Sequence, residues 1–312
     1  MTIHGIHTID TGFVRPQFDA AYLIIENGRG AFIDCGTNFS VPRMLAALGG
    51  AGITAAEVDW LILTHVHLDH AGGAGELIAQ LPNAKLVVHP RGARHMIDPS
   101  ALWAGASAVY GEEVMEREYG RLRPIPAERV VEADDGHVVD LAGRSLRCID
   151  TPGHAKHHIA IHDARANVCF TGDVFGLSYR EFDTGNGPFI LPTTSPVQFD
   201  PEALHASIDR LVALQPEAMY LTHYDRVENV AKLAADLHQQ IDAMVALARA
   251  AHGRPDRHAT LTASLTDLYA ERAEVHGWRQ GREALCRLLA MDIELNAQGL
   301  AVWLDSAQRR AQ

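Results

Sequence analysis

Four potential metal ligands lie within six residues of one another, in the segment Thr64-His-Val-His-Leu-Asp-His-Ala-Gly-Gly73. His65 and His67 share one face while the chain is extended, because successive side chains of a strand point in opposite directions. Asp69 and His70 follow on a turn that opens the next helix. Imidazole and carboxylate groups so close together at the end of a strand can serve two adjacent metal ions. Metal-dependent chemistry is therefore the first expectation.

Three further candidate ligands lie where a strand is predicted to run into a loop. His154 ends Asp150-Thr-Pro-Gly-His, Asp173 ends Cys169-Phe-Thr-Gly-Asp, and His223 ends Tyr220-Leu-Thr-His. One edge of the sheets could gather them. Neutral imidazoles bind zinc or iron well, and a carboxylate can bridge two cations. Two metals roughly 3.5–4 Å apart lower the pKa of a shared water towards about 7, which provides hydroxide for hydrolysis at neutral pH.

The first segment resembles the His-x-His-x-Asp-His signature of the metallo-β-lactamase superfamily, and the later Pro-Gly-His, Gly-Asp and Thr-His elements follow in that family's order. The likeness covers roughly residues 1–225. It implies two metals and a bridging water or hydroxide. The implied ligands are His65, His67 and His154 for the first metal, Asp69, His70 and His223 for the second, and Asp173 as the bridge. Asp69 is the candidate catalytic residue, because it could also orient the hydroxide or relay its proton.

Short apolar strands must position these ligands. Residues 21–36 read as a hairpin around Asn27-Gly28, residues 41–51 as a helix, and residues 59–64 as a buried strand. Further strands are predicted at residues 85–89, 144–149, 159–162, 168–171 and 218–222. Residues 31–36 and 167–173 both run from apolar residues into Asp and Gly, which indicates two similar halves. We expect an α+β fold, an αβ/βα four-layer sandwich over residues 1–225.

Two other regions depart from this rhythm. Residues 94–123 are predicted to be a helical insertion, and residues 226–312 a C-terminal helical region with helices near 230–251, 261–275 and 282–300. The insertion and the loop after Asp173 could form an apolar wall around a small substrate. The candidate substrate-binding residues are Trp103, Tyr110, Phe175 and Tyr179. For the insertion, packing on the C-terminal helices or on a partner subunit is nearly as well supported.

Composition limits the partners. The 312 residues carry a net charge of −12, which disfavours nucleic acid as a substrate. No apolar run reaches the ~18 residues of a membrane span, and the first residues do not read as a signal peptide, so a cytoplasmic location is expected. The four cysteines are scattered, which disfavours a disulfide framework or a thiolate zinc site. A small-molecule substrate is expected, and a homodimer stays open.

The resemblance implies hydrolysis of a small ester-like bond, with thioesters and lactones favoured. Glyoxalase II-like thioester hydrolases share the ligands and carry a C-terminal helical part, but residues 226–312 show no basic cluster for glutathione. Acyl-homoserine lactonases place a tyrosine where this chain has Gly176, with Tyr179 later. Zinc is the default metal, and iron or manganese would also suit nitrogen and oxygen ligands.

Two alternatives from other classes remain open. A persulfide dioxygenase-like oxidoreductase uses a similar motif with a single iron, and metal identification with an oxygen-uptake assay would distinguish it. A non-catalytic metal-binding protein is disfavoured by the intact ligand set. Among the other polar residues, His157 or His158 could support a ligand. Asp34 is predicted either to bond a ligand histidine or simply to form a turn.

Overall fold

The structure, a computed structural model, describes residues 3–194 and 197–311, without the side chains of residues 109, 110, 308, 310 and 311. The chain forms two compact units. Unit 1 comprises Met1–Asp150, His157–Gly172 and Pro216–Arg226, and unit 2 comprises Thr151–Lys156, Asp173–Gln215 and Val227–Gln312. Unit 2 thus takes in two segments that precede the domain boundary predicted between residues 225 and 226.

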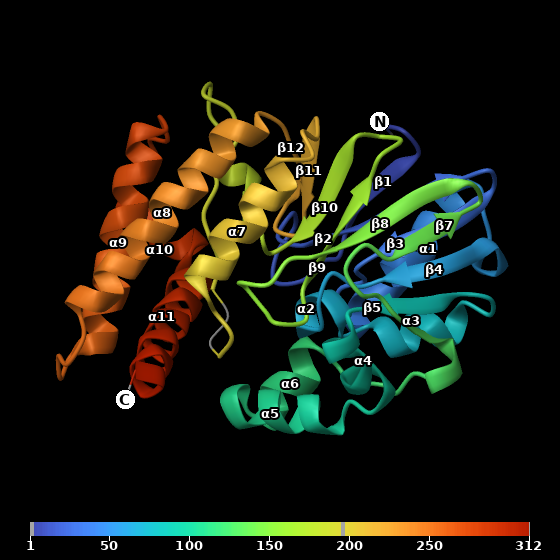
Figure 1. The fold of residues 1–312 in the computed structure, drawn as a ribbon, viewed down its shortest axis with the longest axis horizontal. Helices are drawn as coiled ribbons and strands as arrows, with labels where there is room; N and C mark the ends of the chain where they lie inside the picture. The colour runs from blue at the N-terminus through green and yellow to red at the C-terminus, as the bar shows by residue number, and fades with distance from the viewer. Residues whose placement is uncertain (1–2, 195–196, 312) are drawn as a thin grey trace. The chain divides into compact units, whose positions relative to one another are not determined.

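Two six-stranded sheets make up the centre of unit 1 among the described residues (Figure 1). The first has the order β1 (Ile6–Asp10), β2 (Ala20–Glu26), β3 (Arg29–Ile33), β4 (Val58–Ile62), β5 (Lys85–Val88) and β6 (Val130–Glu132). The second has the order β12 (Asp225–Val227), β11 (Ala218–Leu221), β10 (Val168–Gly172), β9 (Ile159–Asp163), β8 (Arg144–Asp150) and β7 (Val138–Leu141).

The two sheets repeat one topological pattern. In the first, β2 and β3 are antiparallel and β3 pairs in parallel with β4. In the second, β9 and β10 are antiparallel and β10 pairs in parallel with β11. The predicted β2–β3 hairpin is present, and Asn27 and Gly28 at its turn both have positive φ, as a tight hairpin turn requires. The similarity of residues 31–36 and 167–173 therefore reflects equivalent strands, and β4 and β11 each lead into predicted ligands.

Successive side chains of a strand point to opposite faces of the sheet, so the core of unit 1 is divided into two clusters, one on each face of the first sheet. Tyr22 and Ile24 of β2 point into the cluster between the sheets, together with Phe170 of β10. Leu23 of β2 and Phe32 of β3 point the other way, into the cluster beneath the helices. β2 and β3 are thus covered on both faces, which explains why their sequences are almost continuously apolar.

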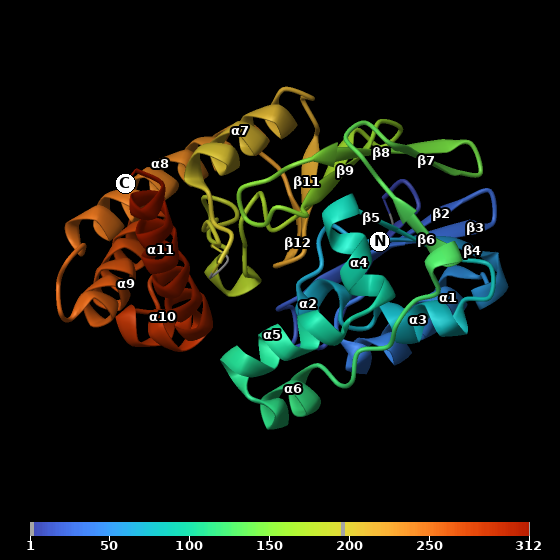
Figure 2. The ribbon, with the colours of Figure 1, turned by 60° about the horizontal axis from the view of Figure 1, so that its bottom comes forward.

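Helices cover the outer face of the first sheet (Figure 2). The predicted helix at residues 41–51 is present as α1, which ends at Gly52 in the left-handed conformation. The predicted insertion contains the end of α4 (Pro90–Ile97) together with α5 (Ser100–Tyr110) and α6 (Glu112–Glu118). The helices of unit 1 are η1 (Asn38–Ser40), α1 (Val41–Ala51), η2 (Ala55–Glu57), α2 (Leu68–Ala71), α3 (Ala74–Gln80), α4 (Pro90–Ile97), α5 (Ser100–Tyr110), α6 (Glu112–Glu118) and η3 (Ala127–Arg129).

A buried ion pair joins the two sheets at one end. The Arg144 side chain of β8 is 1% exposed, and its guanidinium contacts the Asp163 carboxylate of β9. It also lies 3.7 Å from a carboxylate oxygen of Glu26 on β2. The Arg144 guanidinium further donates to the His4 carbonyl at 2.7 Å. Several acceptors therefore satisfy a charge that would otherwise be costly to bury.

Unit 2 is mainly helical. Its helices are η4 (Arg180–Phe182), α7 (Pro201–Val212), α8 (Val230–Ala250), α9 (Arg257–Val275), α10 (Arg282–Leu288) and α11 (Ala290–Ala311). The predicted helices at residues 230–251 and 261–275 correspond to α8 and α9. The predicted helix at residues 282–300 is instead divided at Leu289, and no glycine or proline marks that break.

Apolar stripes and a few paired polar groups hold unit 2 together. Leu237 and Ile241 of α8 are buried, as are Tyr269 of α9 and Asn296 of α11. The Asn296 amide donates to the Tyr269 hydroxyl at 2.8 Å and accepts from the Thr194 backbone at 2.8 Å. These bonds tie the segment before α7 to the terminal helix. Within the described residues of both units, no helix is long and apolar enough to cross a bilayer.

Candidate metal centre

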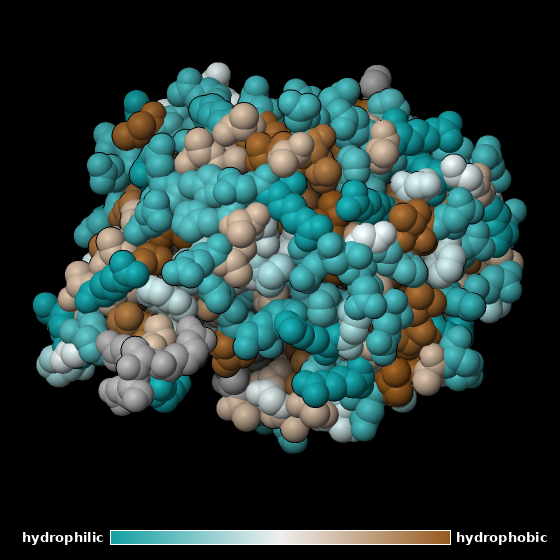
Figure 3. Space-filling model, in the orientation of Figure 1, coloured by the Kyte–Doolittle hydropathy of each residue, from teal (hydrophilic) through white to brown (hydrophobic). Residues whose placement is uncertain are grey.

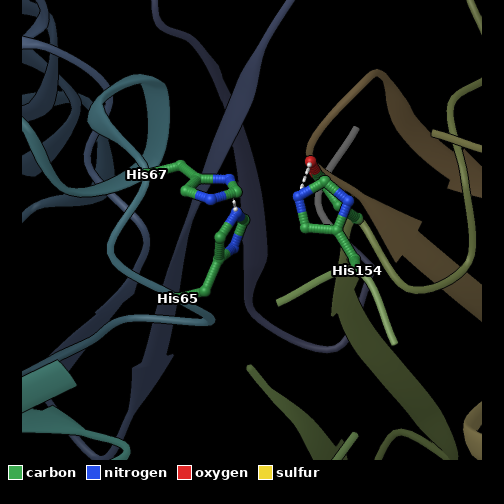
Figure 4. Close-up of side chains that lie close together, drawn as sticks. His65, His67 and His154 are labelled. Atoms are coloured by element: carbon green, nitrogen blue, oxygen red, sulfur yellow. Dashed lines mark hydrogen bonds and ion pairs between the residues drawn. The ribbon is translucent and has the colours of Figure 1, made fainter. Parts of the chain in front are cut away.

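His65 and His67 lie immediately beyond β4, on chain that is still extended. Both side chains therefore emerge on one side, and Nε2 of His65 lies 2.9 Å from Nδ1 of His67 (Figure 4). His65 is fully buried, whereas His67 is half-buried. The Thr64 hydroxyl lies 3.1 Å from Nδ1 of His65, which directs the opposite ring nitrogen towards His67. The strand end thus presents two imidazole nitrogens to one point.

A second group comprises Asp69, His70 and His223, whose ligand atoms all lie within 4.8 Å of one another. Asp69 and His70 belong to the single turn of α2, and His223 follows β11. Nε2 of His70 lies 3.6 Å from Asp69 Oδ2, and Nε2 of His223 lies 3.5 Å from the same oxygen. Residues 153 positions apart in the sequence therefore meet because β4 and β11 end on the same side of unit 1.

Asp34 links the two groups. Its carboxylate accepts from the Thr64 backbone and hydroxyl, both at 2.8 Å, and lies 2.9 Å from Nδ1 of His70. The Thr222 hydroxyl donates to it at 3.2 Å. Asp34 is 2% exposed and has φ +55°, a conformation that aspartate tolerates better than most residues. Of the two roles predicted for Asp34, the structure shows the hydrogen bond to a histidine that is a predicted ligand, His70.

Asp19 positions His223. The sequence analysis did not identify Asp19, because it belongs to no recognisable motif. It precedes β2, is completely buried, and its Oδ1 lies 2.5 Å from Nδ1 of His223. Burial raises the pKa of the Asp19 carboxyl to about 6, and the His223 imidazole opposes that rise. Phe18 packs edge-on against the same imidazole, with ring centroids 5.6 Å apart. The ring of His223 is thereby held from two sides.

The donor atoms of this second group suit a divalent metal ion. His70 and His223 each turn Nδ1 to a buried aspartate and Nε2 to Asp69. Metal-bound histidines characteristically pair their other ring nitrogen with a carboxylate in this way. Two ligands at ~2.0–2.1 Å from a tetrahedral zinc are about 3.3 Å apart, close to the separations from Asp69 Oδ2. These residues therefore fit the metal ion that the resemblance of the sequence motif implies.

His154 and Asp173 lie together in unit 2. Nε2 of His154 is 3.2 Å from Asp173 Oδ2, and both side chains are buried. Nδ1 of His154 is 3.4 Å from the Thr193 carbonyl. Gly153 has φ +133°, and a Cβ there would lie 2.4 Å from the Leu204 backbone, so only glycine lets this turn approach α7. The predicted Pro-Gly-His element thus packs tightly where it carries its histidine.

His157 and His158 lie beside His65 in unit 1. The His158 ring is fully buried with its centroid 5.0 Å from that of His65. The His157 ring stands edge-on to His67 at 5.7 Å. A Cβ on Gly172, just before Asp173, would lie 2.7 Å from both the His158 ring and the Thr64 hydroxyl. Both histidines thus pack around the predicted ligands, as the sequence suggested for one of them.

The candidate substrate-binding residues belong to both units. Trp103 of α5 lines a hollow of about 470 Å³ together with Leu122. The side chain of Tyr110 lies outside the described part of the structure. Phe175 and Tyr179 are in the interior of unit 2, where the Tyr179 hydroxyl is 3.1 Å from the Asp292 carboxylate of α11. Their part in substrate binding stays a prediction.

Comparison with known proteins decides the family. The model of the metallo-β-lactamase superfamily matches residues 14–223, which is more than half of the chain. The chain belongs to the metallo-β-lactamase superfamily. The predicted fold class and the prediction of a superfamily hydrolase are therefore confirmed.

Individual superfamily members extend the likeness. A metallo-β-lactamase fold-containing protein of Sulfurisphaera tokodaii is 28% identical over 72% of this chain and 79% of its own length. A hydroxyacylglutathione hydrolase of Acidiphilium cryptum is 30% identical over 79% of this chain and 81% of its own. The structure of a metallo-β-lactamase family protein from Thermus thermophilus has a TM-score of 0.68 and 22% identity over 97% of this chain and 94% of that one. The last comparison concerns the fold alone.

Proposed function

We propose that this superfamily member is a dinuclear metal-dependent hydrolase that cleaves a thioester or lactone in a small molecule. One observation carries the proposal. In the group of Asp69, His70 and His223, each imidazole rests on a buried aspartate and turns its other nitrogen to Asp69. A purely structural cluster has no need to direct three ligand atoms to a common point, whereas a metal site does.

The full ligand set follows from the motif order. We propose that Asp69, His70 and His223 hold one metal, that His65, His67 and His154 hold the other, and that Asp173 bridges the two. Chain connectivity supports this set, because Asp173 directly follows Gly172 of β10. His154 is three residues before His157, which limits their separation to about 11 Å. Zinc suits a site of imidazole and carboxylate ligands, and iron or manganese would also fit.

Each group would have a distinct part in the reaction. When bound, two metals would supply a water of lowered pKa and polarise the substrate carbonyl. Asp69, with a side chain 25% exposed, would accept a hydrogen bond from that water and take its proton. Asp34 and Asp19 would keep His70 and His223 in the tautomer that leaves Nε2 available to a metal.

The substrate class rests on the relatives and on charge. A relative that is 30% identical is named a hydroxyacylglutathione hydrolase, an enzyme of the glyoxalase II-like branch, which supports a thioester. The net charge of −12 argues against a polyanionic substrate. We therefore place a small neutral or weakly charged acyl compound ahead of a phosphodiester.

Elemental analysis combined with a substrate panel tests this function. Purified protein loaded with zinc, iron or manganese would be assayed on a thioester, a lactone and a phosphodiester. We expect two metals per chain and turnover of the thioester or the lactone. A single iron together with oxygen uptake on a persulfide would instead establish the dioxygenase alternative. Metal binding without turnover of any substrate would favour a non-catalytic role.

A further inference from the structure

Helices α7 and α8 of unit 2 carry a reciprocal arrangement of histidine and aspartate. His205 and Asp209 are four residues apart on α7, and His238 and Asp242 have the same spacing on α8. Side chains so spaced lie on one helix face. Nε2 of His205 is 3.2 Å from Asp242, and Nε2 of His238 is 3.0 Å from Asp209. Each histidine therefore bonds the aspartate of the opposite helix.

The remaining ring nitrogens face one another. Nδ1 of His205 lies 2.5 Å from Nδ1 of His238, and the two ring planes are nearly parallel, at 17°, with centroids 4.8 Å apart. A neutral imidazole carries a single N–H, which here is used to donate to an aspartate. Both Nδ1 atoms then present lone pairs to each other. With this tautomer on both rings, the contact offers a position between the two Nδ1 atoms for a cation, which is either one shared proton or a metal ion.

We propose that His205 and His238 form a further metal site, which takes a divalent transition ion such as Zn²⁺, Ni²⁺ or Cu²⁺. Imidazole nitrogen suits these ions, and the Irving–Williams order favours them over Mg²⁺ or Mn²⁺. Asp209 and Asp242 are already placed to fix the tautomer of each ligand. All four residues belong to unit 2, and none is among the seven predicted ligands of the proposed catalytic centre. The inference is therefore independent of the proposed function.

The surroundings allow the metal to enter. The side chains of His205 and His238 are 27% and 26% exposed, and the view over α7 and α8 in Figure 3 is mostly hydrophilic. Zinc bonds of ~2.0–2.1 Å place two imidazole nitrogens about 3.3 Å apart. The rings must therefore separate by about 0.8 Å from their present contact, a movement open to partly exposed side chains. Water would complete the coordination.

Calorimetric titration of the metal-loaded enzyme tests this site. Zn²⁺ is added to protein that retains its zinc after dialysis, in two buffers of different ionisation enthalpy. We expect one further equivalent of Zn²⁺ to bind, and the difference between the two buffers gives the number of protons that are released on binding. Elemental analysis of the product gives the same count.

Substitutions show which residues bind the further equivalent of Zn²⁺. His205→Gln and His238→Gln should each remove it, while the retained zinc, the hydrolytic rate and the melting temperature stay as in the wild type. Asp209→Asn should keep the stoichiometry but weaken binding about 10–100-fold. The matched control is His258→Gln, because His258 is an exposed histidine of α9 that also pairs with a carboxylate, that of Glu294. An absent further equivalent in the wild type, or its persistence in His205→Gln, would overturn the proposal.

Discussion

Two groups of histidines in this chain rest on aspartates, and their surroundings are opposite. In unit 1, His70 and His223 follow strands and are supported by Asp34 and Asp19, which are 2% and 0% exposed. In unit 2, the pair of His205 and His238 lies on helix faces, and the supporting Asp242 side chain is 79% exposed. The same histidine–carboxylate unit is therefore built once inside a core and once at a surface.

The two groups of histidines differ in how rigidly their imidazole rings are held and in how easily water reaches them. Buried carboxylates surrounded by packed strands keep imidazoles in one orientation and limit access of bulk water, as a catalytic centre needs. Exposed partners on helices permit the rings to move, as a site that opens to admit an ion needs. The comparison predicts large losses of activity from changes in unit 1 and only a loss of metal binding from changes at His205 and His238.

The largest effect is expected at Asp69. Asp69→Ala should lower kcat by about 10²–10⁴-fold, because in the proposed mechanism the carboxylate serves both a metal and the attacking water. The rate of ester or thioester hydrolysis is measured together with the metal content. His162→Ala, a change on β9 away from the ligands, is the control and should stay near wild type. Near-wild-type turnover of Asp69→Ala would show that another group positions the water.

The buried and the exposed ion pairs of the chain should likewise differ in how much they contribute to the free energy of unfolding. Arg144→Met removes one partner of the buried ion pair with Asp163, and should lower the free energy of unfolding by about 3–5 kcal/mol. The exposed pair of Arg254 and Asp256 in unit 2 offers the matched change, Arg254→Met, which should leave the denaturation midpoint unchanged. Denaturant titrations followed by circular dichroism measure both. Equal effects of the two substitutions would contradict the importance given to burial.

Substitutions of Asp34 and of Asp19 should differ in the number of metal ions whose binding they weaken. Asp34 bonds Thr64, which orients His65, and also His70, so Asp34→Ala should weaken the binding of both metals. The close contact of Asp19 is with His223, so Asp19→Ala should weaken chiefly the metal that His223 would hold, about 10–100-fold. Competition with a chelator, followed by elemental analysis, counts the metals retained. Loss of both metals from Asp19→Ala would remove this distinction.

The sequence predicted those parts of the site that depend on neighbouring residues or on a periodic apolar pattern. His65, His67, Asp69 and His70 are contiguous, and an apolar strand precedes them, so their meeting was predictable. Asp19 has no such signature, because its role depends on β2 and β11 belonging to different sheets whose ends converge. His205 and His238 meet through the packing of two helices, and their register cannot be read from either helix alone. The break at Leu289 lacks a glycine or proline signal.

The smallest effect concerns the thiols. Cys35, Cys148 and Cys169 of unit 1 are fully buried, and burial raises the pKa of the latter two to about 12. Almost no thiolate forms on them at pH 8, and the thiolate is the reactive species. Cys286 of unit 2 is partly exposed. Titration with a disulfide reagent should therefore modify about one thiol rapidly, and all four after unfolding. Rapid reaction of Cys148 would indicate that the strands of unit 1 open readily.

The central claim is that the predicted ligands, which follow the ends of strands such as β4, β10 and β11, hold two metal ions. Anomalous diffraction at the zinc edge from crystals of the zinc-loaded protein tests it most directly. The account predicts two strong peaks with the Asp173 carboxylate between them, one bounded by His65 and His67 and the other by Asp69, His70 and His223. A single peak, or a structure in which His223 or Asp173 points away from His65, would contradict it.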